Sequence, residues 1–287
     1  MVEAEANLLA LADIHSGAEF KYPNDYPHAA DWERYFAQIA FMAEQLDREH
    51  PHALVIAGDL THDNTIEQAQ VLAPLLAKIK IPKIAVKGNH DFRGTNGRVV
   101  QQLFEDAGVI FLEEDYTVLD VHDQKLAFYG FSGFPGKQEE AETARLPHLS
   151  DRMMRNHAYT EMYIPKLRTA LTELEAQGIP TVIITHYAPT ADTIDATFAE
   201  TQFPSKQFSH PVSPNLHPGI VKEIDRHAAI VRHIFHGHTH DTQAPFRGFP
   251  FAKTPAGISV ENVAAPMLLR LPDFPPNQPP VVRRRIH

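Results

Sequence analysis

The sequence predicts an α/β protein whose functional site lies at the carboxyl ends of parallel strands. Short apolar runs at residues 8–12, 53–57 and 83–86 alternate with stretches of helical periodicity at 31–49 and 64–80. Polar side chains follow each apolar run within one or two residues. Alternating strands and helices are typical of a parallel sheet, and the carboxyl ends of its strands meet at one edge. We therefore expect these polar side chains to form one site.

The pattern of strands changes after residue 106. A helix is expected at 98–106, and the apolar runs 109–112, 116–121 and 125–129 then follow one another with only short polar turns. Such spacing predicts strands that pair without crossover helices. The sheet content should therefore be mixed and divided between two sheets.

The second half of the chain combines further strands with long irregular connections. A helix is expected at 157–177, with Gly178 as its C-terminal cap, and another at 219–228. The expected strands are 181–185, 230–235, 258–263 and 267–271. The segments 130–156 and 187–218 have no such periodicity, and connections of this length are often functional, so we expect the second to form a rim around the site.

Two details concern the first helices. Asp31 stands where an N-cap is expected. Pro74 is expected to disturb the helix at 64–80, because proline removes one backbone hydrogen bond.

Composition limits the class of protein. With 287 residues, of which 43% are apolar, the chain can bury a large core, and we expect one domain over residues 1–271. The Pro- and Arg-rich tail at 272–287 is expected to be an extended surface segment. There is no Cys, so disulfides, thiolate metal ligands and Cys nucleophiles are excluded, whereas 18 His residues are present.

Charge and hydropathy restrict the partners. The net charge of −10 argues against a broad binding surface for duplex nucleic acid. The apolar run at 8–12 is too short for a signal peptide, and no run reaches the roughly 20 apolar residues that cross a bilayer. We expect a soluble cytoplasmic protein with no membrane partner. The sequence contains no signal for an oligomeric state.

Five segments place oxygen or nitrogen donors at or just beyond the ends of apolar runs. In chain order these donors are Asp13 and His15; Asp59; Asn89, His90 and Asp91; His186; His238 and His240. One such segment is weak evidence, whereas five of them in this arrangement are specific. The alternative is that the acids cap helices and the histidines are hydrogen-bonded core residues.

These donors resemble the calcineurin-like metallophosphoesterase superfamily, whose pattern is D-x-H, G-D, G-N-H-D or G-N-H-E, a lone His, and G-H-x-H. The resemblance covers residues 8–241. It implies a four-layer α/β/β/α sandwich of two mixed sheets, with a dinuclear metal site at the C-terminal ends of the strands.

The resemblance also implies a role for each donor. Asp59 would bridge the two metal ions. Asp13, His15 and His240 would complete one metal site, and the other would be completed by Asn89, His186 and His238. Gly237 would let the backbone pass close to the site.

The implied reaction explains these residue types. Two cations about 3.5–4 Å apart neutralise phosphoryl oxygens and lower the pKa of a bound water. The resemblance implies in-line attack by a metal-bridging hydroxide. His90, oriented by Asp91, would protonate the departing alkoxide or stabilise charge in the transition state. The nitrogen and oxygen ligands suit Mn, Fe, Zn, Co or Ni, and of these Mn, Fe and Zn are expected. The general order of metal affinities does not select one of them.

Other polar residues are not assigned to the core site. His62 either faces the cleft or has a supporting or surface role, and Arg93 could help to bind a phosphate. His210 and His217 lie in the long loop and could contact substrate, but surface roles are expected for them. His236 is expected to end a strand.

The leading hypothesis is a metal-dependent phosphodiesterase or phosphomonoesterase that acts on a small phosphate ester, with nucleotides among the candidates. The Asn89-His90-Asp91 form looks more like the bacterial cyclic-nucleotide phosphodiesterase branch than the Ser/Thr protein phosphatases, which favours a diester. One alternative is an SbcD-like nuclease, which would be expected to carry further DNA-facing domains. The other is a non-catalytic scaffold on the same fold, which would be expected to lack ligands or the catalytic His.

Overall fold

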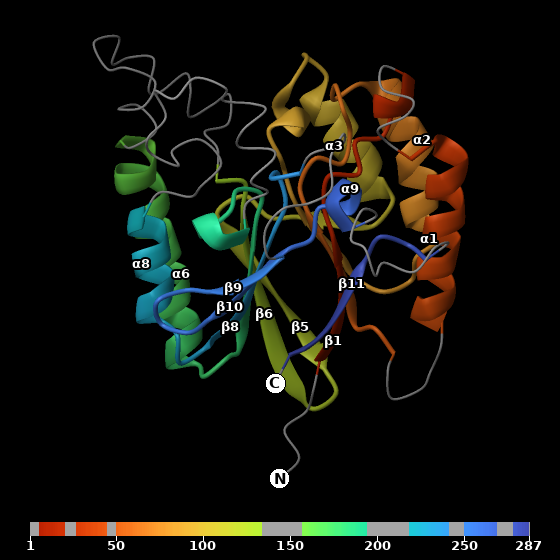
Figure 1. Cartoon of the computed structure of the whole chain (residues 1–287). Helices are drawn as coiled ribbons and strands as arrows, with labels where there is room; N and C mark the ends of the chain where they lie inside the picture. The colour runs from red at the N-terminus through yellow and green to blue at the C-terminus, as the bar shows by residue number, and fades with distance from the viewer. Residues whose placement is uncertain are drawn as a thin grey trace.

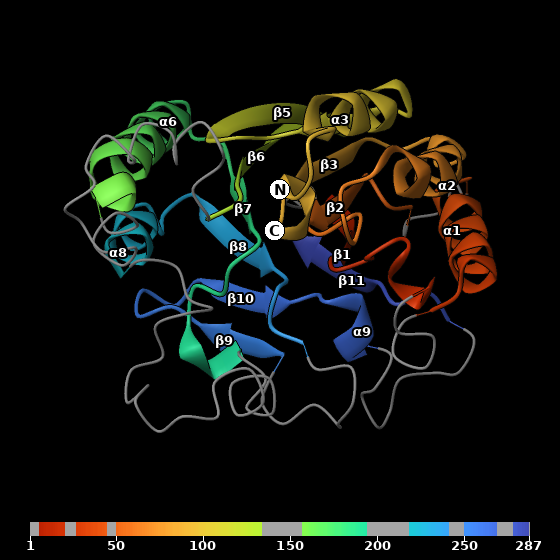
Figure 2. The ribbon, with the colours of Figure 1, turned by 90° about the horizontal axis from the view of Figure 1, so that it is seen from above.

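Two β-sheets face each other, and helices cover the outer face of each sheet (Figures 1 and 2). The computed structural model describes residues 6–20, 27–44, 50–133, 157–193, 218–240, 250–268 and 278–286, and the structural statements below concern these residues. The four-layer α/β/β/α arrangement expected from the resemblance is confirmed.

The first sheet joins strands from the two ends of the chain. In spatial order its strands are β11 (Val282–Ile286), β1 (Ala6–Leu11), β2 (Ala53–Ala57), β3 (Lys83–Val86) and β4 (Val109–Phe111). Strands β1 to β4 are parallel, as the alternation of strands and helices predicts. The edge strand β11 is antiparallel to β1.

Three helices pack on the outer face of the first sheet. They are α1 (Ala29–Glu44), α2 (Ile66–Ala77) and α3 (Gly97–Asp106). Their buried side chains, such as Phe36, Leu72 and Phe104, share one core with Leu9 and Ile56 of the strands. Helical spacing of the apolar positions therefore directs one stripe of each helix towards the sheet.

The second sheet contains the strands from the middle and later parts of the chain. In spatial order they are β5 (Asp115–Val121), β6 (Gln124–Phe131), β7 (Thr181–Thr185), β8 (Val231–His236), β10 (Ser259–Asn262) and β9 (Phe251–Lys253). The four central strands are parallel, whereas β5 and β9 form antiparallel edges. The prediction of mixed sheets is therefore confirmed.

Helices α6 (Ile164–Ala176) and α8 (Pro218–Arg226) cover the outer face of the second sheet, and a π-helical turn, η3 (Ala158–Tyr163), leads into α6. Between the two sheets lies a third apolar cluster that includes Leu8, Val55, Phe128, Ile184 and Phe235. The central strands are buried on both faces, which explains why they occur in the sequence as continuous apolar runs.

The helices bear on three expectations, of which one is wrong. Helix α1 begins at Ala29, so Asp31 lies in its first turn and its prediction as N-cap is wrong; its carboxylate accepts a hydrogen bond from the His28 backbone N at 3.2 Å. Pro74 lies inside α2, which continues to Ala77. The cap expected at Gly178 is confirmed, because this residue has φ +65° and the next N–H bonds to Leu174 O at 3.0 Å.

The chain changes sheets between β4 and β5. Strand β4 pairs with β3 in the first sheet, whereas β5 pairs with β6 in the second. The expectation that residues 109–112 pair with 116–121 is therefore wrong. The turn includes Glu114 in a left-handed conformation at φ 55°, and its backbone N bonds to Gly130 O across the second sheet at 2.9 Å.

The last described segments also differ from expectation. Residues 265–268 form the short helix α9 (Ala265–Leu268) where a strand was expected at 267–271, and that prediction is wrong for the part that the structure describes. Residues 282–286 are extended, as expected for the tail, but they form β11 instead of lying on the surface. Val282 and Ile286 on one face of this strand are buried.

Most of the two irregular segments, residues 134–156 and 194–217, lies outside the described residues, as do His210 and His217. None of the helices in the described ranges is long and apolar enough to cross a membrane.

Candidate metal centre

The expected donors stand just beyond the carboxyl ends of strands from both sheets. Asp13 follows β1, Asp59 follows β2 and Asn89 follows β3, all in the first sheet. His186 follows β7, and His238 and His240 follow β8 of the second sheet. Backbone hydrogen bonds join the connecting turns: Asp13 N donates to Gly58 O at 3.0 Å, and Gly237 N donates to His186 O at 3.1 Å. The parallel sheets therefore deliver donors from five distant segments to one place.

A first group of donors contains Asp13, His15 and His240. The Nε2 atom of His240 lies 3.2 Å from Asp13 Oδ1 and 3.3 Å from His15 Nε2. His15 Nε2 lies 3.7 Å from Asp13 Oδ1. Atoms that bind one metal ion at about 2.0–2.2 Å lie about 3–3.6 Å from one another, so this group has the spacing of a metal site.

A second group forms around His186. Its Nε2 atom lies 3.0 Å from Asn89 Oδ1 and 3.4 Å from Asp59 Oδ2. The His238 ring packs beside it, with 4.9 Å between the ring centroids, and also lies 4.3 Å from the Tyr187 ring. The structure thus brings Asn89, His186 and His238 together, as the resemblance implies.

The surroundings of His186 favour a positive charge at this group. Its Nδ1–H donates to the Ala57 carbonyl at 2.9 Å, so Nε2 directs a lone pair at two oxygen atoms when the ring is neutral. Burial alone would lower the pKa of His186, but the charge of Asp59 and its hydrogen bond outweigh this effect and raise the pKa to about 9. A proton therefore binds here readily, and a metal ion would satisfy the same donor atoms.

Asp59 lies between the two groups. Its Oδ2 atom is 3.6 Å from His15 Nε2 and 3.4 Å from His186 Nε2. Its Oδ1 atom accepts a hydrogen bond from the His90 backbone N at 2.8 Å. Burial would raise the pKa of Asp59, but the charges of His186, His90 and His15 hold it well below its usual range. The carboxylate therefore stays ionised and faces both donor groups.

The remaining imidazoles are suited to act as neutral ligands. Burial lowers the pKa of His15 and of His238 well below the usual value, although Asp59 opposes the shift in both cases. An imidazole must be unprotonated at one nitrogen to bind a metal ion. The donor set, with carboxylates and neutral imidazoles, therefore fits a pair of divalent metal ions.

The backbone at the site is unusual. Four of the expected ligands have left-handed conformations: Asp13 with φ 56°, His15 with φ 48°, Asp59 with φ 53° and His238 with φ 68°. Glycines beside them allow close packing. A Cβ at Gly237 would lie 2.3 Å from Asp13 Oδ2, and one at Gly88 would lie 2.1 Å from Asp59 Oδ1. The expected close passage of the backbone at Gly237 is therefore present.

The expected partner of His90 is corrected by the structure. The Asp91 carboxylate does not orient the ring; it accepts hydrogen bonds from the backbone N atoms of Leu60, Thr61 and Gly88 at 3.0–3.2 Å and from the Thr61 hydroxyl at 3.3 Å. Burial, and then the charge of Asp59, raise the pKa of Asp91 to about 6. Asp91 therefore holds the β2 and β3 turns together instead of holding His90.

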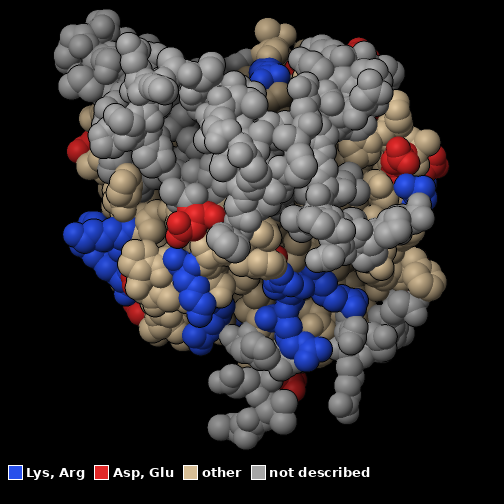
Figure 3. Space-filling view, viewed as in Figure 1, with Lys and Arg blue, Asp and Glu red and all other residues tan. Residues whose placement is uncertain are grey.

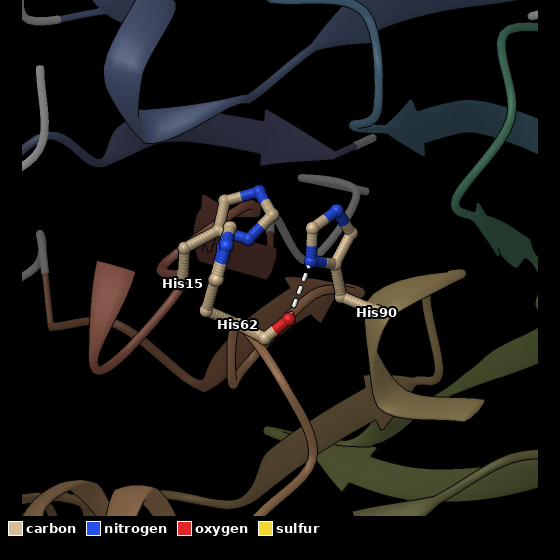
Figure 4. A group of neighbouring side chains, drawn as sticks. All are labelled: His15, His62 and His90. Atoms are coloured by element: carbon tan, nitrogen blue, oxygen red, sulfur yellow. Dashed lines mark hydrogen bonds between the residues drawn. The ribbon is translucent and has the colours of Figure 1, made fainter. Parts of the chain in front are cut away.

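The ring of His90 is oriented by two residues that lie outside the predicted core site. Its Nδ1–H donates to the His62 carbonyl at 2.6 Å, and Arg93 Nη2 donates to its Nε2 at 2.8 Å. Burial, opposed by Asp59, lowers the pKa of His90. Figure 4 shows the rings of His15, His62 and His90 gathered together. Their centroids are 4.4 Å apart for His15 and His90, and 4.8 Å apart for His62 and His90.

The sequence could indicate the contact of Arg93 with His90, but not that of His62. Arg93 caps the 3₁₀ turn η2 (His90–Phe92) and lies three residues after His90, a spacing that places side chains on one face of such a turn. His62 reaches the site because the turn after β2 runs beside Ser16, through an isolated bridge between Ser16 and Thr61. No pattern in the sequence predicts this contact between two loops.

A buried polar network fixes the turn that carries His238 and His240. Asn262 Nδ2 donates to Thr239 O at 2.9 Å and to Thr193 O at 3.1 Å. His236 ends β8, as expected, and its Nε2 lies 2.8 Å from the Thr193 hydroxyl. Burial lowers the pKa of His236 to about 4. Its neutral ring therefore supports the turn from within the core.

A family model described as calcineurin-like phosphoesterase matches residues 6–242. This range contains every expected metal ligand, from Asp13 to His240. A comparison with curated protein sequences gave no match.

Solved structures share the fold at low sequence identity. Phosphopantetheinyl hydrolase from Mycobacterium tuberculosis is 16% identical with a TM-score of 0.53, and the match covers 99% of this chain and 97% of that one. A 5′-nucleotidase from Candida albicans is 12% identical with a TM-score of 0.53, covering 98% of this chain and 51% of that one. The sulfate thiohydrolase SoxB from Thermus thermophilus is 13% identical with a TM-score of 0.51, and the match covers 92% of this chain and 52% of that one. The chain thus spans about half the length of the last two proteins, and these likenesses concern the fold.

Proposed function

Because this chain belongs to the calcineurin-like phosphoesterase family, we propose that it hydrolyses a small phosphate ester, with a diester favoured, at a dinuclear metal centre. The observation that carries the proposal is the position of Asp59. One oxygen of this buried carboxylate lies 3.6 Å from His15 Nε2 and 3.4 Å from His186 Nε2, and it therefore faces both donor groups at once.

The proposed ligands divide into two sets that share Asp59. Asp13, His15 and His240 would hold one ion, and Asn89, His186 and His238 the other. Two bound ions supply charge neutralisation for phosphoryl oxygens and a water of lowered pKa. The donor types suit Mn, Fe or Zn.

His90 is the proposed catalytic side chain next to the substrate. The hydrogen bond from its Nδ1 to the His62 carbonyl fixes the ring, so that Nε2 is the atom that meets the substrate. Once Nε2 has also taken up a proton, so that the ring is an imidazolium, His90 would pass that proton to the departing oxygen. Asp91 supports this residue indirectly, because its hydrogen bonds hold the turns from which Asp59 and His90 project.

Two alternatives are less well supported. A scaffold without activity has no need for the full ligand set and His90, all of which this chain retains. An SbcD-like nuclease needs a basic track for DNA, whereas this chain has a net charge of −10. On the face in Figure 3, Lys and Arg side chains lie in separate groups over α8, β9 and β11.

The experiment that tests the proposal compares two esters on protein stripped of metal and reloaded with Mn²⁺. We expect hydrolysis of both bis(p-nitrophenyl) phosphate and p-nitrophenyl phosphate, with the higher kcat/KM for the diester. A higher kcat/KM for the monoester would overturn the diester assignment and point to nucleotide or sugar phosphates. Activity on neither ester with two ions bound would overturn the proposal in favour of a scaffold, and cleavage of DNA alone would favour the nuclease.

A further inference from the structure

Arg93 places an exposed cation beside the buried donor groups. Its Nη1 donates to the His62 carbonyl at 3.2 Å and its Nη2 donates to His90 Nε2 at 2.8 Å. Among the residues that the structure describes, no carboxylate forms an ion pair with this guanidinium. In a protein with a net charge of −10, such a cation next to a site for an anionic substrate requires an explanation.

The backbone holds Arg93 in a fixed position. Asn64 Nδ2 donates to Arg93 O at 2.8 Å, and Arg93 N donates to His90 O at 3.1 Å. Asn64 itself has a left-handed conformation with φ 55°. The side chain therefore extends from an anchored point, and only its outer end needs to move when a ligand arrives.

The partners of the guanidinium are both neutral acceptors. His90 Nδ1 is the donor to His62 O, so Nε2 of a neutral His90 has only a lone pair to offer to Arg93. A phosphate oxygen is a better acceptor, because its negative charge attracts the guanidinium and because arginine and phosphate often form a bidentate pair of hydrogen bonds. An arriving phosphate therefore competes favourably for Nη2.

We propose that Arg93 and His90 form a phosphate-binding subsite on the exposed side of the donor groups, in which Arg93 leaves His90 Nε2 and binds a phosphoryl oxygen of the substrate. This inference rests on the proposed function. The same movement frees His90 Nε2 to face the substrate. Arg93 is thus a substrate-binding residue, and His62 is a positioning residue whose carbonyl holds both side chains.

The subsite has a consequence for the substrate class. A phosphomonoester carries about −1.5 to −2 charge at pH 7, whereas a diester carries a single charge. Attraction to the guanidinium grows with this charge. Arg93 therefore favours monoesters relative to diesters, and its removal should lower kcat/KM more for monoesters than for diesters.

The test uses full-length protein reloaded with Mn²⁺ and compares wild type with Arg93→Ala, Arg93→Lys and the control Arg98→Ala. Arg98 is an exposed arginine in the first turn of α3, so its removal changes the net charge equally. Binding of inorganic phosphate is measured by calorimetry, and kcat and KM are measured for p-nitrophenyl phosphate and its bis ester.

In Arg93→Ala we expect phosphate binding to weaken about tenfold, as for loss of a charge-assisted hydrogen bond. The ratio of monoester to diester kcat/KM should fall, mainly through KM. Arg93→Lys should recover part of the phosphate affinity, and Arg98→Ala should match wild type.

Unchanged phosphate affinity and ester ratio in Arg93→Ala would overturn the inference. So would a loss of kcat with KM and phosphate affinity unchanged, because Arg93 would then act only through the position of His90. If wild type hydrolysed neither ester, the proposed function would fail, while phosphate binding would still decide whether Arg93 contacts an anion.

Discussion

At the scale of single residues, the site combines side chains suited to metal binding with backbone conformations that carry strain. A left-handed conformation in a residue other than glycine costs on the order of 1–3 kcal/mol. Asp13, His15, Asp59 and His238 all adopt it, and they cluster at the two proposed ion positions. The surrounding fold therefore imposes these conformations. The strained backbone lies in the turns that position the proposed metal-binding atoms.

The proposed separation of roles predicts different effects for two substitutions. His90→Ala should lower turnover by about 10²–10⁴-fold, the usual contribution of a general acid, while the metal content stays unchanged. Asp59→Ala should empty at least one ion position, because this carboxylate faces both donor groups. Elemental analysis of the purified variants, together with steady-state kinetics, measures both effects.

The matched control for His90→Ala is His157→Ala, which removes an exposed histidine at the start of η3. It should match wild type in turnover and in metal content. If His90→Ala lost metal as well as turnover, the assignment of His90 outside the ligand set would be wrong.

Residue types were easier to predict from the sequence than residue partners. The donors Asp13, Asp59 and His186 follow apolar runs, and parallel strands bring such positions together. The sequence does not show that Asp91 faces the backbone N–H groups of Leu60 and Thr61 instead of His90. Such contacts depend on the path of the turns, which no periodicity encodes.

At the scale of elements, β11 links the end of the chain to both sheets. It pairs with β1 in the first sheet, and Arg284 reaches across to Glu261 of β10 with hydrogen bonds of 2.7 and 2.5 Å. The Glu261 side chain is fully buried. In the sequence this region was recognised as extended, but its short Val-Arg-Arg-Arg-Ile run has too few apolar residues to predict a paired strand.

Arg284→Ala should therefore destabilise the fold by about 2–4 kcal/mol, because it leaves a buried carboxylate without its bidentate partner. His233 Nε2 lies 3.4 Å from Glu261 Oε2, so the carboxylate keeps one polar neighbour and the loss of stability is smaller than for a carboxylate with no partner. Urea unfolding followed by circular dichroism measures the change.

The comparison variant for this prediction is Arg232→Ala, which removes an exposed arginine from β8 of the same sheet. It should change the unfolding free energy by less than about 0.5 kcal/mol. Equal effects of the two substitutions would show that the contact of Arg284 with Glu261 adds no stability.

At the scale of the whole molecule, the site exists only where the two sheets meet. His15 and His240 are separated by 225 residues, and their Nε2 atoms lie 3.3 Å apart. The family resemblance implies the layers, and the change in the strand pattern after residue 106 agrees with two sheets. The sequence does not predict that the chain crosses between sheets after β4, since a short polar turn serves a hairpin and a crossing equally well.

The central claim is that the buried donors hold two metal ions that are required for phosphate ester hydrolysis. The most direct measurement adds Mn²⁺ stepwise to metal-free protein and follows both bound metal per chain and hydrolysis of bis(p-nitrophenyl) phosphate. The account predicts no hydrolysis without metal and a plateau at about two ions per chain. Full activity in the metal-free protein, or two bound ions with no hydrolysis of any phosphate ester, would contradict it.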